Sequence, residues 1–250
     1  MATPKSIVVL GGSGFVGRSI CREAVRRGWR VTSLTRHGAP PNVAQDGLLK
    51  GVEWRTGSAL DAAVYDELLA GKDYLVHSIG ILFESNPLYN LYKSQPVEYS
   101  ASYRALIRDT AELAVAAAER LGIRCFGYVS AARYGALGSA LLPEYMQRKA
   151  EAEELIRRTR RSMGAVIVRP GFMYGSDRWA TIPISLGVSA MSLFTAGLLP
   201  RSLCVETVAR ALLNQISALE DGGAASAAAD TGPSTDPVVL EVDDIARLGA

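Results

Sequence analysis

The sequence has few histidines, few cysteines and almost no net charge. Two histidines, His37 and His77, are too few for a histidine-rich metal site, and the three cysteines lack the spacing of a zinc site. We therefore predict no metal-binding residues. The formal net charge is only +2, which gives no electrostatic argument for nucleic-acid binding. An odd number of widely spaced cysteines favours buried thiols in a reducing compartment.

A long uninterrupted apolar run is also missing. The most apolar stretch, residues 180–200, has no charge but contains Pro183, Gly187 and Gly197, so it is a poor transmembrane span. A buried helix with loops and a lipophilic pocket both remain compatible with it. The residues before the first expected strand are too few for a secretory signal or an Arg-rich transit peptide. We expect no transmembrane span, and any organelle address lies elsewhere, was removed or does not exist.

Apolar runs and helical patterns alternate along the 250 residues. Strands are expected at 7–10, 30–35, 52–56, 74–78, 125–130 and 165–169, and helices after the first strand, at 102–121 and at 144–161. Strands separated by helical crossovers predict an α/β fold with a doubly wound parallel sheet. Residues 1–220 then form one domain, with a small substrate region from about residue 176. Residues 221–250 are expected to be a flexible linker and a C-terminal tail, whose last 14 residues could return as a strand and a helical turn.

The first strand runs directly into a glycine cluster that precedes a helical pattern. Glycines at 11 and 12 permit a tight turn, Gly14 lets backbone N–H groups approach a pyrophosphate, and Gly17 lets the helix pack closely on the strand. The helix N-terminus then faces the phosphate charge. The segment predicted to hold a dinucleotide is Gly11, Gly12, Ser13, Gly14, Phe15, Val16 and Gly17.

A second indication lies at the end of the second strand, where folds that select NAD usually place an acidic residue. This sequence has Arg36 there. A guanidinium cannot accept a hydrogen bond from the ribose 2′-OH, but it can make charge-assisted contacts to a 2′-phosphate. Arg36 therefore predicts that NADP(H) is preferred over NAD(H); a solvated surface arginine is the alternative.

A third indication is the pair Tyr145 and Lys149, which share one face of the helix expected at 144–161. A lysine ammonium lowers the pKa of a nearby phenol and can also hold a nicotinamide ribose. Tyr145 could then act as a general acid or base near neutral pH. This pair is predicted to be catalytic, and Lys149 also to contact the cofactor.

With these motifs in order, the chain resembles the short-chain dehydrogenases/reductases of the extended or atypical kind. The resemblance rests on Gly11-x-x-Gly14-x-x-Gly17, on Tyr145-x-x-x-Lys149 and on residues 169–175, and it covers about residues 6–215. It implies a Rossmann fold. It also implies that the cofactor is neighboured by Ser78 and Gly80 after the fourth strand, and by Pro170, Gly171 and Phe172 after the sixth. After the third strand, Ser58 replaces the common Asp, which weakens the implied contact with the adenine amino group.

Residues 77–84, 128–132 and 168–174 are similar to atypical members associated with mitochondrial coenzyme Q biosynthesis and to the related Rossmann-type accessory subunit of respiratory complex I. This resemblance implies NAD(P)(H) binding and a matrix-side role, associated with the inner membrane, in quinone metabolism or complex assembly. The implied partners are a mitochondrial membrane protein complex or a quinone-like lipid.

The sequence departs from the pattern of active family members. Ala132 stands where they carry a Ser or Thr that orients the substrate. Ser130, two residues earlier, is the candidate replacement, and a hydrogen bond to the backbone alone is the alternative. The helix at 102–121 contains no asparagine for proton relay, and the segment between Gly175 and Val205 is short for a substrate lobe. Three hypotheses remain: an accessory protein that holds NADP(H), an active NADPH-dependent reductase of a carbonyl or quinone-like substrate, and a redox- or nucleotide-sensing regulator. The sequence does not separate the third from the first.

Overall fold

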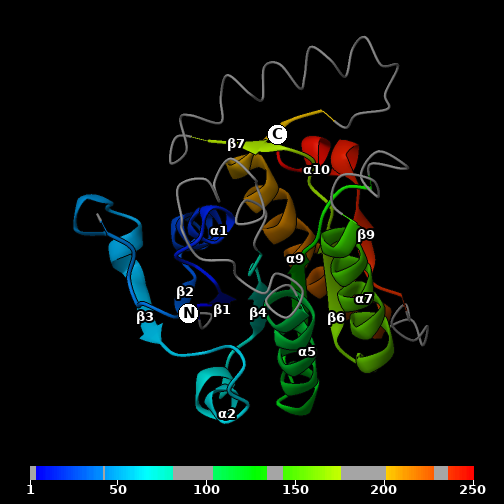
Figure 1. Cartoon of the computed structure of the whole chain (residues 1–250), viewed down its shortest axis with the longest axis horizontal. Coiled ribbons are helices and arrows are strands. Elements are labelled where there is room, and N and C mark those ends of the chain that lie inside the picture. The colour runs from blue at the N-terminus through cyan, green and yellow to red at the C-terminus, as the bar shows by residue number, and fades with distance from the viewer. Residues whose placement is uncertain (1–3, 42, 81–103, 134–142, 176–200, 228–235) are drawn as a thin grey trace.

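The structure, a computed structural model, describes residues 4–41, 43–80, 104–133, 143–175, 201–227 and 236–250. Seven parallel strands form the main sheet in the order β3-β2-β1-β4-β5-β6-β9 (Figure 1). They are β1 (Ser6–Leu10), β2 (Arg30–Thr35), β3 (Val52–Thr56), β4 (Tyr74–His77), β5 (Cys125–Val129), β6 (Gly164–Val168) and β9 (Val238–Leu240). A second, two-stranded sheet pairs β7 (Met173–Tyr174) with β8 (Leu203–Cys204). The predicted doubly wound parallel sheet is confirmed.

Helices cover both faces of this sheet (Figure 1). The described helices are α1 (Phe15–Arg26), α2 (Val64–Leu69), the π-helix η3 (Arg104–Asp109), α5 (Thr110–Arg120), α7 (Pro143–Thr159), α9 (Val205–Ala227) and α10 (Val242–Leu248), with 3₁₀ turns η1 (Val43–Gln45) and η2 (Leu49–Gly51). In β1, Ile7 and Val9 pack in the cluster with α1 and α9, whereas Val8 and Leu10 pack in the cluster with α2, α5 and α7. A strand buried on both faces is apolar throughout, which explains the continuous run in the sequence.

The C-terminal part differs from the expected flexible linker, whereas the strand and helical turn that the sequence left open for the last 14 residues are present as β9 and α10. Helix α9 continues through residue 220 to Ala227, so the predicted boundary falls inside a helix; residues 228–235 lie outside the described part. Alanine-rich sequence looks like low complexity but has the highest helix propensity. Beyond it, β9 pairs with β6 as the seventh strand, and Leu240 and Ile245 are buried in the core. This segment is thus integral to the domain.

The helix predicted over 102–121 begins as a π-helix. Residues 104–109 form η3, α5 follows, and Gly122 has a φ of +72° just after the helix end, as expected for a C-terminal glycine. Within the described part of the chain, we find no helix with both the length and the apolar character needed to cross a membrane.

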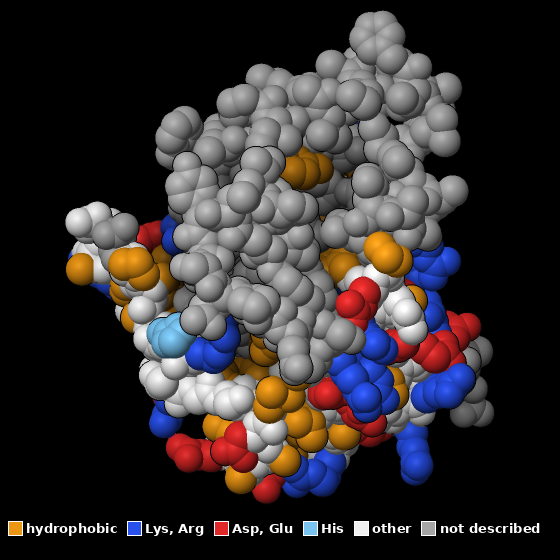
Figure 2. Space-filling model, in the orientation of Figure 1, with side chains coloured by type: hydrophobic (Ala, Val, Ile, Leu, Met, Phe, Trp, Pro, Cys, Tyr) orange, Lys and Arg blue, Asp and Glu red, His pale blue; other side chains and the backbone are white. Residues whose placement is uncertain are grey.

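Charged side chains of both signs are interspersed on the face shown in Figure 2. Some of them pair one helical turn apart, such as Arg108 of η3 with Glu112 of α5, and Arg158 with Glu154 on α7. Such pairs at or near the surface contribute little to stability.

Candidate nucleotide-binding site

The glycine turn after β1 has the geometry that the sequence predicts. Gly11 has a φ of +82°, its N–H donates to the Leu34 carbonyl at 2.9 Å, and its own carbonyl accepts from the Gly14 N–H at 2.9 Å. A Cβ at Gly12 would lie 2.2 Å from Ser33 Oγ, and one at Gly17 would lie 2.2 Å from the Gly11 carbonyl oxygen. Side chains at positions 11, 12 and 17 are therefore incompatible with this turn.

Helix α1 begins directly after this turn, with Gly14 as its N-cap. Its first turn contains no acidic side chain, so no carboxylate of its own neutralises the positive end of the helix dipole. Backbone N–H groups and this dipole together make a suitable place for a phosphate.

A pocket of about 180 Å³ lies over this turn, at the carboxyl ends of β1 to β4. Seven of the residues predicted to contact the cofactor line it: Gly11, Ser13, Gly14, Arg36, Ser58, Ser78 and Gly80. Eight further residues line it that the sequence did not indicate: Leu34, Thr35, Gly57, Ala59, Leu60, Ile79, Leu106 and Thr110. Gly12 and Gly17 instead lie beneath the turn, where they allow close packing. The structure thus brings together residues from four separate loops, and their contact with a cofactor stays a prediction.

Arg36 is exposed at the edge of this pocket, one residue after β2. The turn behind it is fixed, because Thr35 Oγ1 donates to the Gly38 carbonyl at 2.6 Å and Gly38 has a φ of +73°. The guanidinium can therefore reach a ligand in the pocket while it remains in solvent.

At the end of β4, Ser78 Oγ donates to the Leu10 carbonyl at 2.7 Å and so ties β4 to β1. Ser58, after β3, uses its hydroxyl to accept the Leu60 N–H at 3.2 Å. Both hydroxyls thus shape the pocket wall as well as lining it.

Tyr145 and Lys149 are both buried on α7. Lys149 Nζ donates to the Val129 carbonyl at 2.7 Å, and it lies 5.9 Å from the centre of the Tyr145 ring and 4.7 Å from that of Tyr128. A Cβ at Gly80 would be 3.8 Å from this nitrogen, so Lys149 adjoins the pocket wall. Burial lowers the pKa of Lys149 to about 7, although the nearby carboxylate of Glu153 opposes this shift.

Ser130 and its surroundings do not form part of the pocket. Ser130 Oγ donates to Glu153 Oε1 at 2.6 Å, within a buried ion pair between Glu153 and Arg169. Ala132, at the position usual for a catalytic hydroxyl, is buried and donates its N–H to the Pro170 carbonyl. The catalytic role predicted for Ser130 gains no support from this geometry and remains a prediction.

The segment after β6 is also absent from the lining of the pocket among the described residues. Pro170 and Gly171 are buried, and the Phe172 carbonyl accepts the Leu203 N–H at 2.9 Å. Residues 176–200, which follow in the chain, lie outside the described part. Cofactor contact at these three positions therefore stays an implication of the resemblance.

One buried residue near the pocket was not predicted to have a role. His77 Nε2 lies 2.8 Å from Thr110 Oγ1, and Thr110 gives its single hydroxyl proton to the Leu106 carbonyl at 2.8 Å. His77 must therefore be the donor in this contact. Burial, reinforced by the Lys149 charge, lowers the pKa of His77 to about 3, so it stays neutral at physiological pH. The only signal in the sequence is a threonine in an otherwise apolar helix face.

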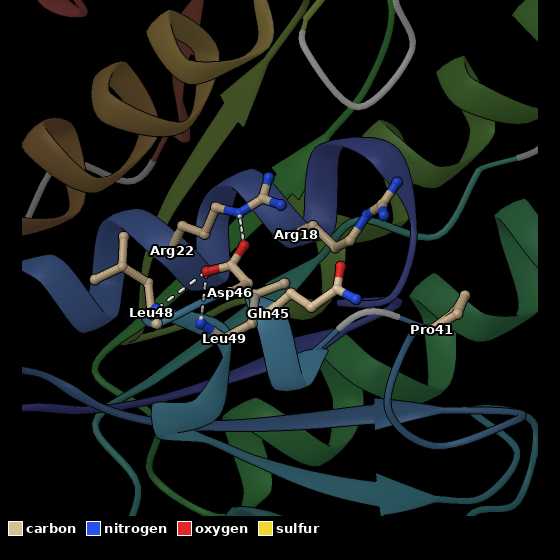
Figure 3. Close-up of a pocket in the computed structure, with 8 residues that line it drawn as sticks. Arg18, Arg22, Pro41, Gln45, Asp46, Leu48 and Leu49 are labelled. Atoms are coloured by element: carbon tan, nitrogen blue, oxygen red, sulfur yellow. Dashed lines mark hydrogen bonds and ion pairs between the residues drawn. The ribbon is translucent and has the colours of Figure 1, made fainter.

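A larger hollow, about 600 Å³, lies between α1 and the connection from β2 to β3 (Figure 3). Arg18 and Arg22 project from α1, and Asp46 accepts hydrogen bonds from Arg22 Nε at 2.6 Å and from two backbone N–H groups. None of the residues predicted to contact the cofactor is among the described residues that line this hollow.

The chain was compared with known proteins. A family model described as NAD(P)H-binding matches residues 11–217. MIOREX complex component 2 of Saccharomyces cerevisiae is 30% identical over 227 residues, which cover 76% of this chain and 80% of that protein. An uncharacterized chloroplastic protein of Arabidopsis thaliana is 31% identical over 182 residues, which cover 72% of this chain but only 54% of that protein.

Solved structures with the same fold include nucleotide-sugar enzymes. The UDP-Glc/GlcNAc 4-epimerase from Campylobacter jejuni matches with a TM-score of 0.66 and 14% identity, covering 97% of this chain and 82% of that one. MoeE5 in complex with UDP-glucose and NAD matches with a TM-score of 0.63 and 16% identity, covering 95% of this chain and 75% of that one. Identities this low show the fold alone. The family match and the glycine turn show that the chain belongs to the NAD(P)H-binding family of Rossmann-type proteins related to short-chain dehydrogenases.

Proposed function

We propose that this protein holds NADP(H) and serves as an accessory or assembly protein in a mitochondrial, quinone-linked complex. The observation that carries the nucleotide part is the single pocket where the glycine turn, Arg36, Ser58, Ser78 and Gly80 meet. A ligand that binds only the folded state stabilises it, so the nucleotide itself could support such a role.

The residues present fit a dinucleotide phosphate. The turn at 11–14 and the α1 N-terminus, which has no side-chain cap, would hold the pyrophosphate. Arg36 and Ser58 would hold the adenosine half, and Gly80 and Lys149 the nicotinamide half. When bound, the nicotinamide supplies or accepts a hydride. Arg36 favours the 2′-phosphate of NADP(H), because it offers donors and the pocket edge beside it has no carboxylate among the described lining residues.

The accessory role is supported by the part of the site next to α7. Ser130 gives its only hydroxyl proton to Glu153, and Ala132 has no hydroxyl to orient a carbonyl. The quinone-linked, mitochondrial location at the matrix side of the inner membrane rests on the resemblance of residues 77–84, 128–132 and 168–174. The yeast relative is named as a component of a complex, which agrees with a role in an assembly.

The second candidate is an NADPH-dependent reductase of a carbonyl or quinone-like substrate. The specific observation in its favour is that Lys149 Nζ lies 5.9 Å from the Tyr145 ring centre, so its charge can stabilise the phenolate of Tyr145. In this function Tyr145 donates the proton to the substrate oxygen.

Binding is tested with purified protein and the variant Arg36→Asp. We expect the Kd for NADPH to rise roughly 10- to 100-fold, the equivalent of one lost charge-assisted contact, while the Kd for NADH changes little. Arg30→Asp is the matched control, since Arg30 is exposed at the other end of β2. Equal weakening of both nucleotides by Arg36→Asp would show that the arginine does not read the 2′-phosphate.

Turnover is tested by NADPH oxidation with a panel of quinones and ketones. The accessory role predicts bound nucleotide without oxidation. Turnover that is abolished in Tyr145→Phe would refute the accessory role and establish the reductase.

A further inference from the structure

A buried ion network lies beside Lys149, on the same helix face. Tyr145, Lys149 and Glu153 follow one another at intervals of four residues on α7, and all three are buried. The sequence singled out the first two. The third, Glu153, belongs to no motif that the proposed function uses.

Both carboxylate oxygens of Glu153 are engaged. Oε1 accepts from Ser130 Oγ at 2.6 Å and from Arg169 Nε at 3.0 Å, and Oε2 accepts from a terminal nitrogen of Arg169. The guanidinium groups of Arg133 and Arg157 lie farther from Glu153, at 3.9 and 4.0 Å from Oε2. Although burial alone would raise it, the bonds from Arg169 and Ser130 lower the pKa of Glu153, so the carboxylate is charged.

Glu153 and Lys149 hold two consecutive residues of the chain. Lys149 Nζ bonds the carbonyl of Val129, the last residue of β5, and Glu153 bonds the hydroxyl of Ser130. The end of β5 is thus fixed to α7 at two points one helical turn apart. Since Lys149 adjoins Gly80 in the pocket wall, this double attachment sets where its ammonium group lies.

Arg169 carries the same network to the C-terminal helix. Its third nitrogen donates to Glu241 Oε1 at 2.6 Å, and its backbone N–H donates to the Leu240 carbonyl at 2.9 Å. Glu241 is the N-cap of α10 and forms a capping box with Asp244. The segment after residue 236 therefore supports, through one arginine, the helix that carries Tyr145 and Lys149.

We propose that Glu153 is a positioning residue of the nucleotide site, which fixes Lys149 and the end of β5 for the nicotinamide half of the dinucleotide. This inference rests on the proposed binding of NADP(H) and adds a residue to it. The adenosine half is held by the glycine turn and by residues after β2 and β3, none of which contacts Glu153 in the described part of the chain.

The test compares two ligands by calorimetry: NADPH, and 2′,5′-ADP, which contains only the adenosine half. In Glu153→Gln we expect the Kd for NADPH to rise about tenfold, as for the loss of one contact of 1.4 kcal/mol, and the Kd for 2′,5′-ADP to stay within about twofold. The matched control is Glu151→Gln, on the same helix, where the carboxylate pairs with Arg148 near the surface. This control should leave both constants unchanged.

Three results would overturn the inference. A parallel weakening of both ligands would indicate a general loss of structure, and unchanged binding of NADPH would show that Glu153 positions nothing. Wild-type protein that binds neither ligand would refute the proposed function itself, and this inference with it. If Glu153→Gln does not fold because the buried Arg169 keeps only its ion pair with Glu241, the double variant Glu153→Gln/Arg169→Met removes both buried charges and carries the same expectation.

Discussion

The substitution Gly17→Ala tests whether close packing of α1 on the glycine turn shapes the nucleotide site. The added Cβ would lie 2.2 Å from the Gly11 carbonyl oxygen and 2.7 Å from Gly12 Cα, whereas real Cβ contacts are essentially never below 3.0 Å. The shortfall at the oxygen is 3.0 − 2.2 = 0.8 Å. Both contacts are with backbone atoms, so no side chain can rotate away, and α1 and the turn must separate.

Two effects follow in Gly17→Ala. Overpacking of this kind costs about 1–3 kcal/mol of unfolding free energy, which in a chain of this size lowers Tm by roughly 2–12 °C. Displacement of the turn also moves the backbone N–H groups that would hold the pyrophosphate. Loss of one charge-assisted hydrogen bond costs about 1.5–3 kcal/mol, so we expect the Kd for NADPH to rise roughly 10- to 100-fold.

The measurements are a thermal melt without ligand and a calorimetric titration with NADPH. Gly47→Ala is the matched control, since a Cβ there meets nothing within 4 Å and its backbone is outside the left-handed region. If Gly17→Ala melts with the control and binds NADPH as wild type does, the close approach is not what fixes the site, and the argument from the glycine spacing fails.

Three further predictions concern stability. The pKa of Lys149 in the folded state, about 7, is below its ordinary 10.5, so the buried charge destabilises the fold fully below pH 7 and less as the pH rises toward 10.5. The unfolding free energy of the wild type should therefore rise from pH 7 to 10. Urea melts of Lys149→Met should lack this rise. Burial alone would raise the pKa of Glu220, but hydrogen bonds led by that from Lys5 lower it to about 2. Its stabilisation is present above pH 4.5 and lost as the pH falls toward 2, so acid titration of Glu220→Gln should show a shallower loss; an equal loss would contradict this. Truncation before residue 237 removes, among others, the buried side chains of Leu240 and Ile245, worth about 1.5–3 kcal/mol each. It should therefore lower Tm, whereas removal of a true tail would leave Tm unchanged.

The fold could be predicted where burial leaves a local pattern. Six of the seven strands of the main sheet were predicted, because a parallel strand buried on both faces is a short apolar run. For the seventh, β9, the sequence left a returning strand open beside a flexible tail, because the strand has only three residues and follows an alanine- and glycine-rich segment. Its place in the sheet depends on β6, which is about 70 residues earlier in the chain.

The same distinction holds within the site. Gly11 and Gly17 could be found from the sequence because a positive φ or a 2.2 Å approach excludes every other residue. Thr110 and Leu106 could not, because their place in the pocket wall depends on the π-helix and on the contact of Thr110 with His77. The surroundings of Lys149 likewise depend on packing between separate elements.

Binding and turnover therefore place different demands on this chain. In the proposed function, the adenosine and phosphate contacts would come from backbone groups and Arg36 at the ends of β1, β2 and β3, and they would need no change of protonation. Proton transfer would need α7 and β5, where Ser130 has only one proton and gives it to Glu153. Changes near β5 can thus remove catalysis and leave the adenosine contacts intact.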